Sequence, residues 1–118
     1  MRCLIVDDNS LFLEGATDLL RREGLDVVGV ATNSAEAIRR VTELRPDVTL
    51  IDIDLGDEDG FELARRLNAI SAASRVILIS THAEEDLVHL IEQSPVLGFI
   101  AKTRLSAQAI RDTLERAA

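Results

Sequence analysis

Short apolar runs alternate with stretches of helical spacing five times along the chain. The apolar runs are four or five residues long, and most are rich in valine and isoleucine, which is typical of strands buried on both faces. Such alternation predicts a parallel sheet with helices on both faces, because parallel neighbours need right-handed helical crossovers. The predicted fold class is therefore a doubly wound α/β sandwich. Its strands are expected at residues 2–6, 27–31, 48–51, 76–80 and 98–101.

The stretches that follow these runs each carry one apolar stripe on an otherwise polar surface, as expected of helices packed against a sheet. No internal repeat, linker or low-complexity segment interrupts the pattern, and 118 residues with 47% hydrophobic content are enough for one core. We therefore expect residues 1–118 to be a single domain. The stripes lie within residues 12–20, 37–44, 63–70, 87–91 and 110–117.

The charge and the terminal sequence limit the partners and the compartment. A net charge of −8 and a pI near 4.7 argue against binding of nucleic acid or an anionic membrane by this chain alone. The single cysteine, Cys3, has no partner for an intramolecular disulfide, which fits a reducing compartment. No apolar run has the roughly 20 residues of a membrane span, and the first residues do not resemble a signal peptide. These features predict a cytoplasmic protein with no membrane association.

A dense acidic cluster follows the third apolar run. The segment "LIDIDLGDEDG" places five carboxylates within eight residues: Asp52, Asp54, Asp57, Glu58 and Asp59. Clustered carboxylates repel one another, and burial removes their hydration, so the arrangement requires a cation or hydrogen-bond donors nearby. We interpret the last three acids mainly as a solvated loop and a helix cap rather than as ligands.

Polar side chains follow four of the five predicted strands. Ligands in doubly wound folds bind beyond the carboxyl ends of the strands, so these side chains are expected to share one site. Carboxylates from two strand ends suit Mg²⁺, and a nearby hydroxyl and ammonium complete a set that fits phosphoryl transfer. The residues concerned are Asp7 and Asp8, Asp52 and Asp54, Ser80, and Lys102.

Four segments, taken in chain order, resemble the signature of a known family. "LIVDDN", "LIDIDLGDEDG", "LIST" and "GFIAK" resemble the signature segments of the receiver domain of bacterial two-component response regulators. The resemblance covers Arg2 to about Ala117. It implies a flavodoxin-like sheet of five parallel strands in the order 2-1-3-4-5 with five helices. It also implies a phosphoacceptor signalling domain, which is not an enzyme although it assists its own phosphorylation and dephosphorylation.

The resemblance assigns a role to each residue of the site. Asp52 is similar to the phosphoacceptor, and Lys102 to the family's lysine. Ser80 matches the hydroxyl residue that moves toward the phosphoryl group, and Phe99 matches the aromatic residue whose rotamer follows it. The implied Mg²⁺ ligands are Asp7, Asp8, Asp52 and the backbone carbonyl of Asp54.

The resemblance also implies partners and a response. The phosphodonor would be a sensor histidine kinase or a histidine phosphotransfer protein. Phosphorylation would repack the face formed by the helix near residues 87–91, the strand 98–101 and the helix near residues 110–117. That face would control a partner or an attached effector, and it is also where a homodimer would form.

The sequence departs from the family pattern in the loops of the site. Thr103 follows Lys102 where the family commonly has a proline with a cis peptide bond, so the geometry of this loop is left open. Gly56 stands where proline is frequent, which predicts a looser loop after Asp52. His82 occupies a position that tunes acyl-phosphate lifetime in the family, but a solvated loop histidine is the simpler interpretation.

Two other functions remain as alternatives. The Asp-x-Asp pair in "LIDIDLG" also resembles the nucleophile motif of haloacid-dehalogenase-type phosphatases, but that family has its nucleophile near the N-terminus and its later acidic pair downstream. A receiver-like module that switches without phosphate is the second alternative, although such domains typically lose an acid, the acceptor or the lysine. The adjacent Asp7, Asp8 and Asn9 could also be no more than helix-capping residues.

Overall fold

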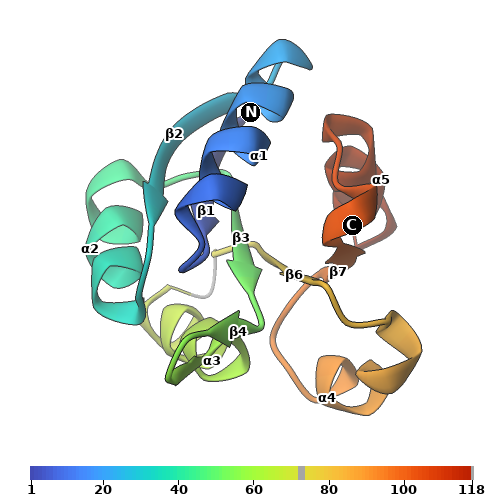
Figure 1. Ribbon diagram of the computed structural model, residues 1–118. Helices are drawn as coiled ribbons and strands as arrows, with labels where there is room; N and C mark the ends of the chain where they lie inside the picture. The colour runs from blue at the N-terminus through green and yellow to red at the C-terminus, as the bar shows by residue number, and fades with distance from the viewer. Residues whose placement is uncertain (72–73, 118) are drawn as a thin grey trace.

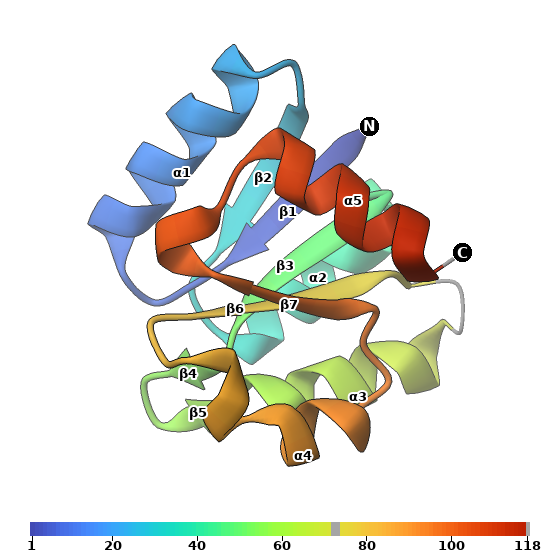
Figure 2. The same ribbon diagram turned by 90° about the vertical axis from the view of Figure 1, so that its right-hand side faces the viewer.

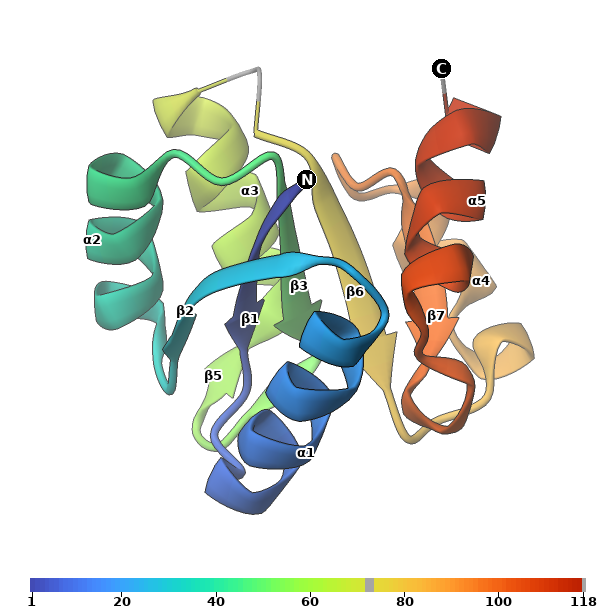
Figure 3. The ribbon, with the colours of Figure 1, turned by 90° about the horizontal axis from the view of Figure 1, so that it is seen from above.

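Five parallel strands form the centre of the structure, a computed structural model that describes residues 1–71 and 74–117. Their order across the sheet is β2-β1-β3-β6-β7, which is the predicted order 2-1-3-4-5 with two extra short strands counted between. Figure 3 shows the arrows of all five strands pointing the same way. The strands are β1 (Arg2–Val6), β2 (Asp26–Ala31), β3 (Val48–Asp52), β6 (Val76–Ser80) and β7 (Gly98–Ala101).

The five α-helices cover both faces of the sheet, as the alternation predicted. Figure 2 shows α1 and α5 above the strands and α3 and α4 below them. None of the helices within the described residues combines the length and the apolarity that crossing a membrane requires. The helices are α1 (Ser10–Arg22), α2 (Ser34–Leu44), α3 (Gly60–Ile70), α4 (Val88–Glu92) and α5 (Ala107–Ala117).

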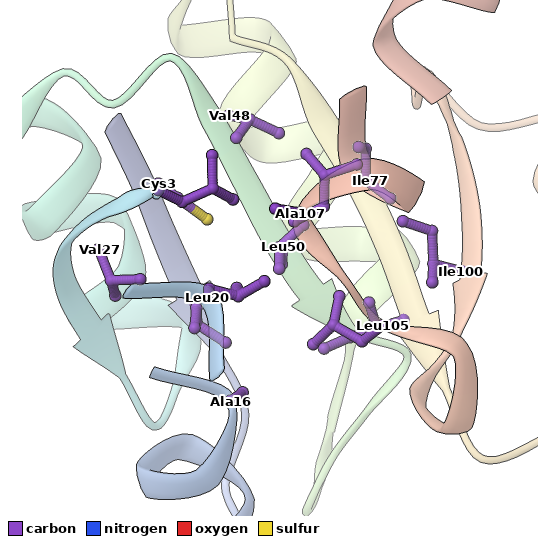
Figure 4. Close-up of a cluster of buried hydrophobic side chains, with 14 of the residues drawn as sticks. Cys3, Ala16, Leu20, Val27, Val48, Leu50, Ile77, Ile100, Leu105 and Ala107 are labelled. Carbon is purple, nitrogen blue, oxygen red and sulfur yellow. The ribbon is translucent and has the colours of Figure 1, made fainter. Parts of the chain in front are cut away.

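Alternating side chains of the strands divide the interior into two cores. Cys3 and Ile5 of β1 point into the core beneath α1 and α5, whereas Leu4 and Val6 point into the core beneath α2 and α3. Figure 4 shows the Cys3 sulfur among apolar side chains of the first core. Burial raises the pKa of this thiol to about 12, so Cys3 is an inert core residue.

The apolar stripe predicted within residues 87–91 forms the short helix α4, but only part of the stripe packs against the core. A 3₁₀ turn at Glu84–Asp86 precedes the five-residue α4, and neither segment begins with a side-chain cap. Val88 and Leu90 are exposed, while Leu87 and Ile91 pack against the second core. Among the described residues, no side chain accepts hydrogen bonds from the first N–H groups of either segment, and a missing cap of this kind disfavours a longer helix.

A two-stranded hairpin follows β3 where a loose loop was expected. Strands β4 (Asp54–Leu55) and β5 (Glu58–Asp59) pair antiparallel across a turn at Gly56, whose φ is +65°. A glycine with positive φ at the first turn position favours a tight two-residue hairpin, so Gly56 closes the turn instead of loosening it. Figure 1 shows β4 directly beyond the arrowhead of β3, so the hairpin lies at the carboxyl end of the sheet.

Candidate functional site

The carboxyl ends of four strands deliver the predicted site residues to one edge of the sheet. Asp7 directly follows β1, Asp52 ends β3, Ser80 ends β6 and Lys102 directly follows β7. The parallel register pairs Asp52 with Ile79, so the ends of β3 and β6 are level. The structure therefore brings these residues together from positions up to 95 residues apart.

Three of the predicted carboxylates form a compact group. Asp7 and Asp52 are buried, Asp8 is exposed, and one carboxylate oxygen from each lies within 4.8 Å of the others. An all-oxygen set of this size suits a hard divalent cation. The group could hold a metal ion, as the sequence predicted.

Of the three adjacent residues Asp7, Asp8 and Asn9, only Asn9 caps α1, so the two acids are available as metal ligands. Asn9 Oδ1 accepts hydrogen bonds from the N–H groups of Leu11 and Phe12 and thereby caps α1. Asp7 Oδ1 accepts the N–H of Asn9 at 2.9 Å, which fixes the orientation of the buried carboxylate. The second oxygen of Asp7 and the carboxylate of Asp8 face the site.

The only lysine of the chain, Lys102, pairs with two of these acids. Its Nζ lies 2.6 Å from Asp7 Oδ2 and 3.1 Å from Asp52 Oδ2. The contact with Asp7 is the shorter of the two ion pairs. Burial acts to lower the pKa of Lys102, but the two carboxylates outweigh it and raise the pKa above its ordinary value. Lys102 therefore carries a positive charge in the site.

The pKa of the Asp52 carboxyl is raised toward neutral pH. Burial and the negative charge of Asp7 raise its pKa to about 6, against the opposing effect of Lys102 and of the Asp54 N–H. In the absence of a metal ion, the ionised form, which can attack a phosphorus atom, is therefore favoured above about pH 6. A divalent cation among the three acids would favour ionisation further.

Asp52→Asn is expected to stabilise the metal-free domain at neutral pH. An aspartate with a pKa of about 3.8 unfolded and about 6 folded binds more protons in the folded state, so its contribution to stability falls as pH rises between those values. The gain in unfolding free energy should be near zero below about pH 4 and reach about 1–3 kcal/mol above about pH 7. Denaturant unfolding of both proteins with a chelator, across this pH range, measures it. A difference that does not change with pH would contradict the assignment.

Two contacts link Ser80, His82 and Asp54 next to the acidic group. Ser80 is fully buried, and its Oγ accepts the N–H of His82 at 2.9 Å. The His82 ring is not simply solvated, because its Nε2 lies 3.0 Å from Asp54 Oδ2 although both side chains are more than half exposed. The side chain of Asp54 is thus turned to His82. Its backbone carbonyl as a metal ligand stays a prediction.

The loop after β7 departs from the family pattern in its geometry as well as in its sequence. No cis peptide bond occurs within the described ranges, so the Lys102–Thr103 bond is trans. The chain instead turns through a 3₁₀ segment, Lys102–Arg104. Phe99, three residues earlier, is buried in the second core, which confirms its expected core position; its rotamer change stays a prediction.

Glu58 contributes a contact that the sequence interpretation missed. We expected a solvated side chain, but Glu58 Oε1 accepts the N–H of Ser34 at 2.8 Å and so joins the β4–β5 hairpin to the start of α2. Asp59 does cap a helix, since its Oδ1 accepts the N–H of Phe61. A Gly-Asp pair between two short segments is a hairpin signal, and Gly56-Asp57 could have revealed this turn.

The sequence matches the family model of the response regulator receiver domain over residues 3–115. The "Probable transcriptional regulatory protein NarL" of Mycobacterium tuberculosis is 31% identical over 116 residues, which are 98% of this chain and 54% of that protein. The chemotaxis protein CheY of Bacillus subtilis is 32% identical over 101 residues, which cover 86% of this chain and 84% of CheY. The chain thus spans about half the length of NarL and most of the length of CheY.

Solved structures agree with the sequence comparisons. The signal receiver domain of NarL from Mycobacterium tuberculosis superposes with a TM-score of 0.84 at 32% identity, covering 98% of this chain and 94% of that one. A LuxR-family two-component response regulator from Aurantimonas sp. gives the same TM-score at 26% identity, with 98% and 84% coverage. Each match covers 98% of this chain, and this likeness over nearly the whole chain decides against the phosphatase alternative.

Proposed function

Because the chain belongs to the response regulator receiver domain family, we propose that Asp52 accepts a phosphoryl group from a phosphohistidine. The donor is a sensor histidine kinase or a histidine phosphotransfer protein. One observation carries the proposal: the Lys102 ammonium bridges Asp7 and Asp52 inside a group of three acids from two strand ends. A buried acceptor carboxylate, a fixed cation and oxygen ligands beside it are the parts that phosphoryl transfer requires.

The metal in this proposal is Mg²⁺. The carboxylates of Asp7, Asp8 and Asp52 and the backbone carbonyl of Asp54 would hold it. The all-oxygen donor set, with one carboxylate oxygen from each of the three acids within 4.8 Å of the others, supports this fit. When bound, the ion supplies positive charge that offsets the acids and the phosphoryl oxygens.

The transfer makes one bond and breaks one. A carboxylate oxygen of Asp52 attacks the phosphorus, the bond from phosphorus to the donor imidazole nitrogen breaks, and the product is a mixed carboxyl-phosphoric anhydride. The imidazole leaves with the electron pair of the broken bond. Lys102 moves from Asp52 Oδ2 to an oxygen of the new dianionic group, where its charge is needed.

The conformational response begins with Ser80, once Asp52 carries the phosphoryl group. Ser80 Oγ turns toward the phosphoryl group and releases the N–H of His82 with which it pairs in the free protein. The space that Ser80 leaves allows the Phe99 ring to move inward. This biases two pre-existing states of the domain, and hydrolysis of the anhydride resets them.

The face formed by α4, β7 and α5 is the proposed output surface, for a partner, an attached effector or a second copy of the chain. Phe99 lines a groove of about 610 Å³ on this face, together with Glu84, Arg104 and Thr113. The short α4, in which Val88 and Leu90 are exposed, supports a surface that can repack at low cost.

Beryllofluoride, which mimics an acyl phosphate, tests the proposal without a kinase. The chain has no tryptophan and no tyrosine, so binding is followed by ¹⁹F NMR instead of intrinsic fluorescence. Bound beryllofluoride signals are expected with Mg²⁺, and they should vanish with a chelator and in Asp52→Asn. Amide shifts should then change on α4, β7 and α5. Mg²⁺-independent binding, or binding that survives Asp52→Asn, would overturn the proposal.

A further inference from the structure

An aromatic ring faces the ammonium of the only lysine. The Lys102 Nζ lies 4.4 Å from the centroid of the Phe12 ring, within the range of a cation–π contact. Phe12 lies on α1, ninety residues earlier in the chain, and belongs to none of the four signature segments. Its side chain is partly buried against the first core, so the ring is anchored on one side and meets the ammonium on another.

The segment that places Asp7 also places this ring. Asp7 Oδ1 accepts the N–H of Asn9, and Asn9 Oδ1 accepts the N–H of Phe12 at 3.2 Å. The first turn of α1 is therefore fixed relative to the buried carboxylate. As a result, Lys102 is enclosed by Asp7, Asp52 and Phe12, and only 14% of its side chain is exposed.

We propose that Phe12 is a positioning residue, which holds the Lys102 ammonium in the site while its contact with Asp52 is exchanged for a phosphoryl oxygen. The inference rests on the proposed function of Asp52. In the free protein two carboxylates hold the ammonium, so the ring adds little. Once Asp52 carries the phosphoryl group, Lys102 exchanges its contact with Asp52, whereas its contact with the Phe12 ring can stay as it is.

The chemistry of the ring suits this role. A ring face attracts a cation without a directional hydrogen bond, so the ammonium can shift between oxygens while it stays over the ring. A carboxylate at this position would instead compete with the phosphoryl group for the N–H donors. An aliphatic side chain would cover Lys102 but would not attract it, and this difference separates positioning from plain packing.

The contact can be observed directly, because the chain has one lysine and its ε-methylene gives one lysine signal. In the metal-free protein, this signal should be shifted by the ring current of Phe12. Phe12→Leu should remove the shift, and Phe12→Tyr should keep it. Leu11→Ala, an exposed neighbour on α1, is the matched control and should leave the signal unchanged. Phe12→Met replaces Phe12→Leu if the latter does not fold.

Beryllofluoride affinity in Mg²⁺ then measures the consequence. Phe12→Leu should bind about two- to fivefold more weakly than the native chain, the range expected for a partly exposed cation–π contact, and Phe12→Tyr should restore the affinity. If the native chain binds beryllofluoride and Phe12→Leu binds equally well, the inference fails while the proposed function stands. If Phe12→Leu binds more weakly and Phe12→Tyr binds just as weakly, Phe12 has only a packing role, and the inference is also overturned. A native chain that binds no beryllofluoride would instead remove the proposed function.

Discussion

Gly60→Ala is expected to destabilise the domain by about 2–4 kcal/mol and to displace the acceptor carboxylate. Gly60 begins α3, and its N–H donates to the carbonyl of Ile53 at 2.8 Å. A Cβ at this position would collide with the backbone carbonyl of Asp52 and lie 2.9 Å from Ile53 Cα. Backbone atoms cannot turn aside as a flexible side chain can, so either α3 or the end of β3 must shift. Denaturant unfolding gives the free energy, and beryllofluoride binding reports the site.

Gly15→Ala is the matched control for this substitution. Gly15 lies in the interior of α1, and a Cβ there would meet nothing within 4 Å outside its own helix. Alanine should stabilise the helix by about 0.5–1 kcal/mol, because it loses less backbone entropy than glycine on folding. The same chemical change should thus have opposite signs at the two positions. Equal stability of Gly60→Ala and the native chain would contradict the close approach of α3 to Asp52.

Lys102→Ala is the second substitution with a large expected effect. Removing the ammonium leaves Asp7 and Asp52 without their described cation, which should cost about 2–4 kcal/mol of unfolding free energy near pH 8 in the absence of metal. The cost should shrink near about pH 5, because Lys102 lowers the pKa of Asp52 and its removal lets that carboxyl take up a proton more readily. Denaturant unfolding at the two pH values measures both quantities.

The same variant separates phosphorylation from the response. Phosphorylation of Asp52 should remain possible in Lys102→Ala with Mg²⁺ and a small phosphodonor, but the amide shifts of α4, β7 and α5 should no longer follow it. Thr103→Ala, at the adjacent exposed residue, should keep both properties. A Lys102→Ala protein that responds normally would exclude the proposed role of Lys102.

The sheet and the strand ends could be predicted from the sequence because both depend on local pattern and on topology. The apolar runs predicted each strand to within one residue, and β1, β6 and β7 have the predicted bounds. The parallel topology then required Asp7, Asp52 and Lys102 to meet, without any knowledge of distances.

The contacts that the sequence did not reveal are those that join a motif residue to a segment outside the motifs. In sequence, Phe12 looks like part of an ordinary helix stripe and Glu58 like part of an ordinary acidic loop, yet the Phe12 ring contacts the Lys102 ammonium and the Glu58 carboxylate accepts the backbone N–H of Ser34. The sequence pattern around one residue cannot predict such pairs, because the positions of α1 and of the β4–β5 hairpin determine which residues meet. The exposure of Leu90 was missed for a related reason: its spacing fits a buried stripe with Leu87 and Ile91, but the packing of α4 leaves it at the surface.

The most direct test of the account is the intact mass of the chain after incubation with acetyl phosphate, with and without Mg²⁺, beside Asp52→Asn. The account predicts one phosphoryl adduct on the native chain, formed only with Mg²⁺ and absent from the variant. An adduct that persists in Asp52→Asn, or no adduct on a folded native chain with Mg²⁺, would contradict it and favour a receiver fold that switches without phosphate.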